Sequence, residues 1–237
     1  MEDYKLAAKY SFMPNRLKYC GPEDSDQVLH DFVVDGKNLG IVKDVLNQFH
    51  ALKIYLNLIS KRNDKNIFDR EVLESYWIGN KLIENIKKEE IKDLILNEFT
   101  KKGLPQSSAQ QLAQNVPERA LPHHSFHVFH IHSISGKLLA TANNMDKCRI
   151  SSGKVKEIKD GTAVVQYKPI AVDEKLSFGK ETEKEIIYNK NFIPYLKNGD
   201  FVAVHWDFAV EKLTPEQVKN LEKYTKINMD AMNTLQA

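Results

Sequence analysis

The sequence predicts an α+β fold with two domains, a mainly helical domain over residues 1–119 and a strand-rich domain over residues 120–237 that ends in a helix. Three observations predict it. Apolar residues recur at helical spacing in the first half. A short loop bounded by Pro117 and Pro122 follows, and beyond it the apolar residues alternate as they do in strands.

The composition is that of a folded globular protein. The 237 residues are 42% hydrophobic and 28% charged, which excludes a disordered chain. A net charge of +2 gives no basic footprint, so we expect no nucleic-acid partner. No apolar run reaches about 18 residues, and the first residues lack a basic-then-apolar signal pattern, so we expect a cytoplasmic protein with no membrane partner. Two cysteines are too few for a disulfide framework.

Four helices are predicted in the first half. Asp44 and Asp69 stand where helix caps are favoured, and Gly103 ends the third helix. The predicted spans are residues 44–59, 69–86 and 89–101, then a short helix from Ser107 or Ser108 that stops before Pro117. Residues 15–40 contain turn sequences and show no clear period.

Five strands and a last helix are predicted in the second half. The strand candidates are residues 125–134, 149–158, 163–169, 185–188 and 201–206, with Gly-containing turn sequences at residues 160–161 and 198–200. Thr214 is the predicted cap of the last helix, with Pro215 at the first helical position and Gln217 where a capping box requires it.

Five of the eight histidines fall in ten residues, and they are His123, His124, His127, His130 and His132. On a strand, His124, His130 and His132 share one face, while His127 lies on the other. Neutral imidazole is a common metal ligand, so we select His130 and His132 as metal ligands. The alternative is that these histidines are buried polar residues hydrogen-bonded to the backbone.

Three segments of the second half carry a family resemblance. Cys148 precedes Gly153-Lys154-Val155, and Asp160-Gly161 precedes Ala163-Val164-Val165. The third segment reads Gly199-Asp200-Phe201-Val202-Ala203-Val204-His205-Trp206-Asp207-Phe208-Ala209. From Cys148 to about Tyr224, the chain resembles the nickel–iron-hydrogenase maturation chaperones of the HypC/HupF type.

This resemblance implies a small OB-like β-barrel on which Cys148 and His205 hold iron. The implied cargo is Fe(II) with cyanide and carbon monoxide ligands, passed from a maturation scaffold protein to a metalloenzyme client. Thiolate and imidazole are suitable iron ligands. The family's cysteine stands at the mature N-terminus, whereas Cys148 is internal, so the His-rich segment is an alternative source of ligands.

The first half supplies a second group of candidates. Residues 10–22 include Asn15, Arg16 and Cys20, and together with residues 122–129 they resemble an uncharacterised prokaryotic family that joins a helical half to a HypC-like half. We select Cys20, Asn15 and Arg16, with His124 and His127, as candidates for partner or ligand binding. The alternative for the residues of the first half is a structural turn.

Three hypotheses of function follow. The first is an accessory protein for metallocentre assembly that binds iron or a maturation partner through Cys148 and His205. The second is an enzyme that uses Cys148 as a nucleophile with a histidine base. The third is a protein-interaction module without metal. We expect the first, and a binding protein rather than an enzyme.

Overall fold

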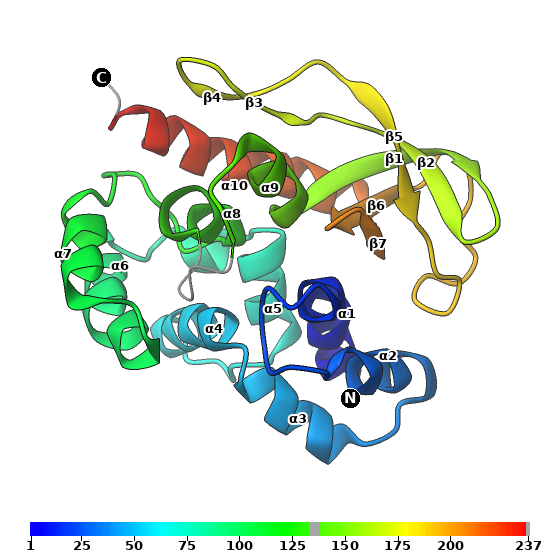
Figure 1. The fold of residues 1–237 in the computed structure, drawn as a ribbon, viewed down its shortest axis with the longest axis horizontal. Coiled ribbons are helices and arrows are strands. Elements are labelled where there is room, and N and C mark those ends of the chain that lie inside the picture. The colour runs from blue at the N-terminus through cyan, green and yellow to red at the C-terminus, as the bar shows by residue number, and fades with distance from the viewer. Residues whose placement is uncertain (133–137, 236–237) are drawn as a thin grey trace.

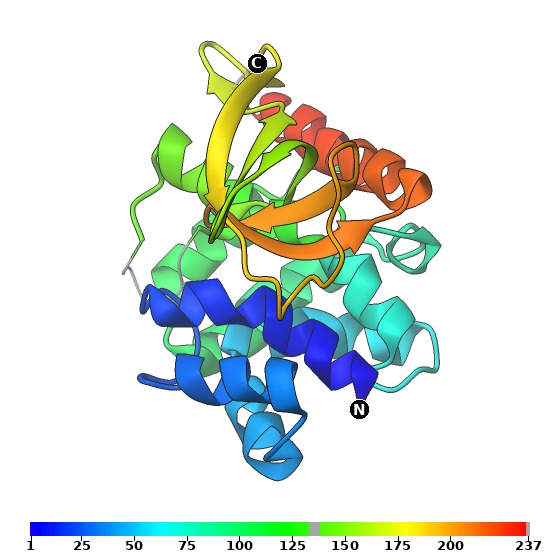
Figure 2. The same cartoon turned by 90° about the vertical axis from the view of Figure 1, so that its right-hand side faces the viewer.

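The computed structural model describes residues 1–132 and 138–235. Figure 1 shows the strands and the C-terminal helix α10, Pro215–Asn233, gathered on one side of the helices formed by the first half. Turned by 90°, the molecule shows helix α1, Glu2–Arg16, running beneath the sheet (Figure 2). The Tyr10 hydroxyl of α1 donates to Glu211 of the sheet at 2.7 Å, so this helix is fixed to the sheet by a polar contact.

The first half is helical, as predicted. Its helices after α1 are α2 (Asp26–Asp35), α3 (Leu39–Asn47), α4 (His50–Arg62), α5 (Arg70–Trp77), η1 (Lys81–Ile83), α6 (Lys88–Asp93), the π-helix η2 (Leu94–Phe99), η3 (Thr100–Lys102) and α7 (Gln106–Gln114). The helix predicted over residues 44–59 is two helices, α3 and α4. Helix α5 begins after the predicted cap Asp69 but ends at Trp77, because Gly79 has a φ of +95° that an α-helix does not allow. Helices α1 and α2 were not predicted.

The second half contains a curled sheet. Its strands are β1 (Ser151–Ile158), β2 (Thr162–Tyr167), β5 (Thr182–Ile187), β6 (Phe201–His205) and β7 (Phe208–Leu213), while β3 (Ile170–Val172) and β4 (Leu176–Phe178) form a separate hairpin. The strand order is β1-β2-β5-β7-β6, and β6 pairs back with β1. One parallel residue pair, Ile187 with Phe208, joins β5 to β7. Four of the predicted strands are confirmed, and they are β1, β2, β5 and β6.

Two sequence signals of this half have clear structural reasons. Gly153 of the Gly-Lys-Val segment faces the side chain of Val165, and a Cβ at Gly153 would stand 2.9 Å from it. A larger residue would therefore force β1 away from β2. Thr214 caps α10 as predicted, accepting from the Gln217 backbone N–H while the Gln217 side chain accepts from the Thr214 N–H.

The predicted histidine-rich strand is wrong. Residues 124–131 form a short helix α8, His124–Phe126, followed by a π-helix η4, His127–Ile131. Every residue from His123 to Ile131 is buried. A helix buried all round has no polar face, so its sequence shows no helical period. The last residues of the predicted strand, 133 and 134, lie outside the described residues.

The hydrophobic core runs across the predicted domain boundary. One cluster of buried side chains includes Tyr76 from the first half and Tyr224 from α10. Asn228 of α10 accepts from the Leu121 backbone N–H at 2.9 Å. The division into residues 1–119 and 120–237 stays a prediction. Over residues 1–132 and 138–235, no helix combines the length and apolar character needed to cross a bilayer.

Candidate metal centre

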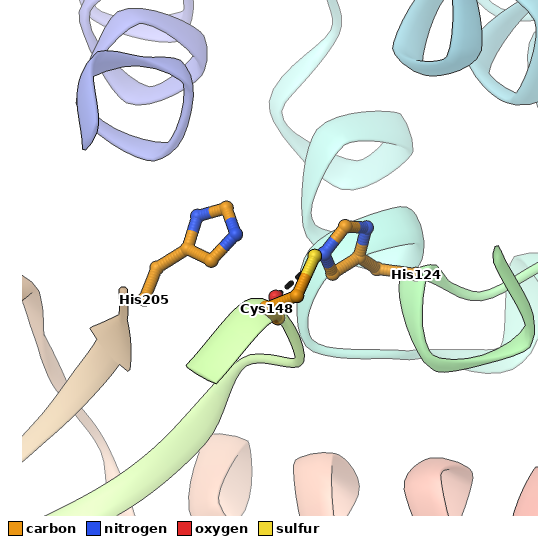
Figure 3. Close-up of side chains that lie close together, drawn as sticks. All are labelled: His124, Cys148 and His205. Atoms are coloured by element: carbon orange, nitrogen blue, oxygen red, sulfur yellow. Dashed lines mark hydrogen bonds between the residues drawn. The ribbon is translucent and has the colours of Figure 1, made fainter. Parts of the chain in front are cut away.

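Three potential metal ligands meet where the helices contact the sheet. His124 begins α8, Cys148 ends helix α9 (Ala142–Cys148), and His205 ends β6. One ligand atom from each lies within 4.8 Å of the other two. Figure 3 shows the Cys148 sulfur beside the His124 ring, with the outer nitrogen of His205 facing both.

The sheet explains why Cys148 and His205 are close. Strands β1 and β6 are antiparallel neighbours, with Ser151 opposite Val204, so the start of β1 lies beside the end of β6. The Trp206 N–H donates to the Lys147 carbonyl at 2.7 Å and joins the two segments directly. The residues before β1 and after β6 are thereby held side by side.

The backbone of α1 fixes the tautomer of His205. Pro14 stands four residues after Tyr10 in α1 and has no N–H, so the Tyr10 carbonyl lacks its usual helical donor. The His205 Nδ1–H donates to that carbonyl at 2.9 Å. The Nε2 atom therefore carries the lone pair, and no described residue hydrogen-bonds to it although His205 is only 1% exposed. A backbone partner on the other ring nitrogen is typical of histidines that ligate metals.

His124 is held by two hydrogen bonds. Its Nε2–H donates to the Cys148 carbonyl at 2.9 Å, which is the dashed line in Figure 3. Its Nδ1 accepts from the Tyr76 hydroxyl at 3.1 Å. Figure 3 shows the Nε2 side of the ring toward Cys148, so a metal shared with Cys148 would bind Nε2 and the ring proton would stand on Nδ1, where the Tyr76 hydroxyl would accept it.

Burial sets the charge of all three groups. It lowers the pKa of His124 to about 4 and that of His205 well below its ordinary value. Both imidazoles are neutral at pH 7 and able to ligate. Burial, and then the charge of Cys20, raises the pKa of Cys148, while a hydrogen bond from Trp206 lowers it. The thiol therefore keeps its proton until a cation replaces it.

The donor set suits a soft or borderline cation such as iron or zinc. With bonds of about 2.0–2.3 Å, tetrahedral ligand atoms stand about 3.3–3.8 Å apart. The observed separation of up to 4.8 Å would close by about 1 Å on binding. Three protein ligands leave a coordination position open.

That position faces a cavity of about 260 Å³. Its lining includes the aromatic side chains of Tyr76, Trp77 and Trp206. Four buried polar atoms of its lining residues have no hydrogen-bond partner within the described part of the chain, and they are Ser11 Oγ, Trp77 Nε1, His127 Nδ1 and His205 Nε2. Unpaired buried polar atoms are costly, so their concentration here indicates a binding cavity.

The structure separates the predicted candidates. Cys20, His127 and His132 line the cavity together with the three ligands. His130, a selected metal ligand, lies elsewhere, because its Nε2–H donates to the Leu112 carbonyl. The convergence predicted for His130 and His132 depended on the strand, and a helical segment points these two side chains in different directions.

The two candidates of α1 have different places. The Asn15 side chain is buried and donates to the carbonyls of Cys20 and Pro22, at 3.0 and 2.6 Å, so it holds the loop that carries Cys20. Arg16 is exposed, with its guanidinium over the ring of Phe12.

Two residues of the first half were missed. Tyr76 contacts His124 through its hydroxyl, and the Trp77 ring lies against His124 with centroids 4.6 Å apart. The sequence placed both only on the apolar side of a helix. Burial raises the pKa of Tyr76, and the charges of Tyr55, Cys20 and Cys148 raise it further.

The fold and site define a protein with a candidate Cys–His–His metal centre. The chain belongs to DUF6390, a family of unknown function whose match spans residues 2–237. No curated protein and no solved structure matches the chain. The family match carries no link to hydrogenase maturation.

Proposed function

We propose that this protein binds a transition-metal ion, iron in the first instance, through Cys148, His205 and His124, and serves as an accessory protein for metallocentre assembly. One observation carries the proposal. Three ligand atoms from separate parts of the chain stand within 4.8 Å of one another, and one of them, His205 Nε2, is buried without a hydrogen-bond partner among the described residues.

The site is better suited to a carried ion than to a permanent structural one. Closed structural sites surround the metal with four protein ligands. Here three ligands border a cavity, so one position is open to a further ligand or a client protein. An ion held this way is easier to pass on.

The hydrogenase setting is part of the proposal and depends on the sequence resemblance. The curled sheet of five strands supports an OB-like barrel, and Cys148 and His205 stand at its β1 and β6 ends. In this proposal the cargo is Fe(II) with cyanide and carbon monoxide ligands, the partner is a maturation scaffold protein, and the client is a metalloenzyme.

The geometry gives less support to a cysteine-dependent enzyme. A nucleophilic cysteine needs a lowered pKa or a base positioned to take its proton. Burial instead raises the pKa of Cys148. Of the two histidines beside Cys148, His124 directs an N–H to the Cys148 carbonyl, and His205 has an Nε2 lone pair that is free among the described residues but no hydrogen bond to the thiol.

The proposal is tested by anaerobic reconstitution with Fe(II) and measurement of bound iron. We expect about one ion per chain in the wild type and loss of most of it in Cys148→Ala, His205→Ala and His124→Ala. His130→Gln is the matched control, because it changes a buried histidine of the same segment whose ring bonds the Leu112 carbonyl. Equal iron in all variants would disprove metal binding at this site.

A pull-down from cell extract separates binding of metal from binding of a partner alone. In the proposed function, a scaffold protein captured by the wild type is lost with Cys148→Ala. A partner captured equally by both proteins would favour an interaction module without metal.

A further inference from the structure

The second cysteine lies at the mouth of the same cavity. Cys20 is exposed, whereas Cys148 is half-buried and the two histidine ligands are buried. Cys20 and Cys148 both line the cavity, as do His124 and His205. Its lining therefore includes one exposed cysteine and one half-buried cysteine that stands beside two imidazoles.

The loop around Cys20 is held in a defined position. Asn15 donates to the carbonyls of Cys20 and Pro22, on either side of Gly21. Gly21 has a φ of +82°, and a Cβ there would stand 2.4 Å from the ring of Phe49. Close backbone packing and two side-chain hydrogen bonds keep this loop against the cavity.

An independent observation indicates that this cavity binds a ligand. His205 Nε2 is buried, faces Cys148 and His124 in Figure 3, and has no hydrogen-bond partner in residues 1–132 and 138–235. Cys20 does not belong to the group whose ligand atoms lie within 4.8 Å of one another. Its place is on the route to the site rather than in it.

We infer that Cys20 is an entry ligand, which binds an incoming thiophilic metal ion at the mouth and passes it to Cys148, His124 and His205. This inference rests on the proposed function. The transfer is a ligand exchange without redox change. The bond from the metal to the Cys20 sulfur breaks as the bond to the Cys148 sulfur forms. The Cys148 proton leaves to solvent, and the released Cys20 thiolate regains a proton.

The test uses Co(II), whose bonds to thiolate give a charge-transfer absorption. Anaerobic Co(II) is mixed with the full-length protein, and the rise of this absorption is followed by stopped flow. We expect Cys20→Ser to load about tenfold more slowly than the wild type and to reach the same final absorption, since Cys148 supplies the one thiolate bound to the ion at the end. Glu23→Ser, an exposed change in the same loop, should load at the wild-type rate.

Alkylation gives a second readout that needs no variant. After loading with Co(II), iodoacetamide should label Cys20 while Cys148 is protected, as measured by mass spectrometry of the peptides. A wild-type loading rate in Cys20→Ser would overturn the inference and leave the metal site intact. A halved final absorption, with Cys20 protected, would overturn it by making Cys20 a resident ligand. A wild type that takes up no Co(II) would overturn the proposed metal site and this inference together.

Discussion

Two buried polar clusters stand side by side where α9 leads into β1, and they differ in how fully their hydrogen bonds are used. In the first, Asp146 accepts from Arg149 at 3.0 Å, from the Tyr167 hydroxyl at 3.0 Å and from the Ile170 N–H at 2.8 Å. Arg149 also donates to the Lys168 carbonyl. Both carboxylate oxygens of Asp146 therefore have hydrogen-bond partners, so we call this cluster saturated, and it stabilises the fold.

The second cluster, His124, Cys148 and His205, includes the residue two positions after Asp146 and is unsaturated. His205 Nε2 has no hydrogen-bond partner within the described ranges, and the bond from His124 Nε2 to the Cys148 carbonyl is one that a metal would replace. The contrast teaches that buried polar groups by themselves do not mark a site. Several buried groups around one cavity that lack partners among the described residues are the stronger indication.

Acid should affect stability more than any single substitution. Burial lowers the pKa of His123 and His127 to about 3 and that of His124 to about 4. Below pH 6.5 the unfolded chain binds these protons and the folded chain does not, so stability falls as the pH falls toward 4. We expect a loss of about 4 kcal/mol per pH unit for the three together, measured by urea unfolding of metal-free protein.

One variant shows how much of this pH dependence comes from His127. His127→Phe keeps the aromatic contacts to Tyr55 and Phe99 and removes one titrating group, so the slope should fall by about a third. An unfolding free energy that stays constant between pH 7 and 5 would contradict the burial of neutral histidines.

Breaking the saturated cluster should have the next largest effect. Asp146→Ala leaves the Arg149 guanidinium buried without its carboxylate, which costs about 3–5 kcal/mol of unfolding free energy. Replacing both residues, as Asp146→Ala with Arg149→Met, should recover part of the loss. Urea unfolding of metal-free protein measures both, and a cost under about 1 kcal/mol for Asp146→Ala would show that the cluster is not structural.

Substitution of a ligand residue in the unsaturated cluster should change the stability of the protein only when metal is present. An ion at about 100 times its Kd should stabilise the wild type by about 2.7 kcal/mol and leave Cys148→Ala unchanged. The measurement is the urea midpoint with and without Fe(II) under anaerobic conditions. Equal stabilisation of both proteins would place the bound ion elsewhere.

The smallest effect we predict comes from Pro14. In Pro14→Ala the restored N–H competes with His205 Nδ1 for the Tyr10 carbonyl, so the tautomer of His205 is less well fixed. We expect about tenfold weaker binding of Co(II), or about 1.4 kcal/mol, in a protein no less stable than the wild type. Unchanged affinity would mean that this carbonyl does not control His205.

Much of the sheet and part of the site could be predicted from the sequence. Strands β1 and β6 have the period and turns that strands require, and the resemblance pointed to Cys148 and His205. His124 was selected only as a candidate for partner or ligand binding, and its place beside Cys148 and His205 could not be predicted, because a helix buried on all sides has no period. Tyr76 and Pro14 act through contacts between the two halves, and local sequence contains no signal for such contacts.

The tautomer set at His205 has a consequence for the proton balance of metal loading. Both imidazoles are already neutral at pH 7, so only the Cys148 thiol has a proton to give up. Binding should release about one proton per ion, which calorimetry in buffers of different ionisation enthalpy would count. Affinity then falls about tenfold for each unit of acidification near neutral pH. In the proposed function, the protein would therefore hold its metal ion less firmly wherever its surroundings turn acidic.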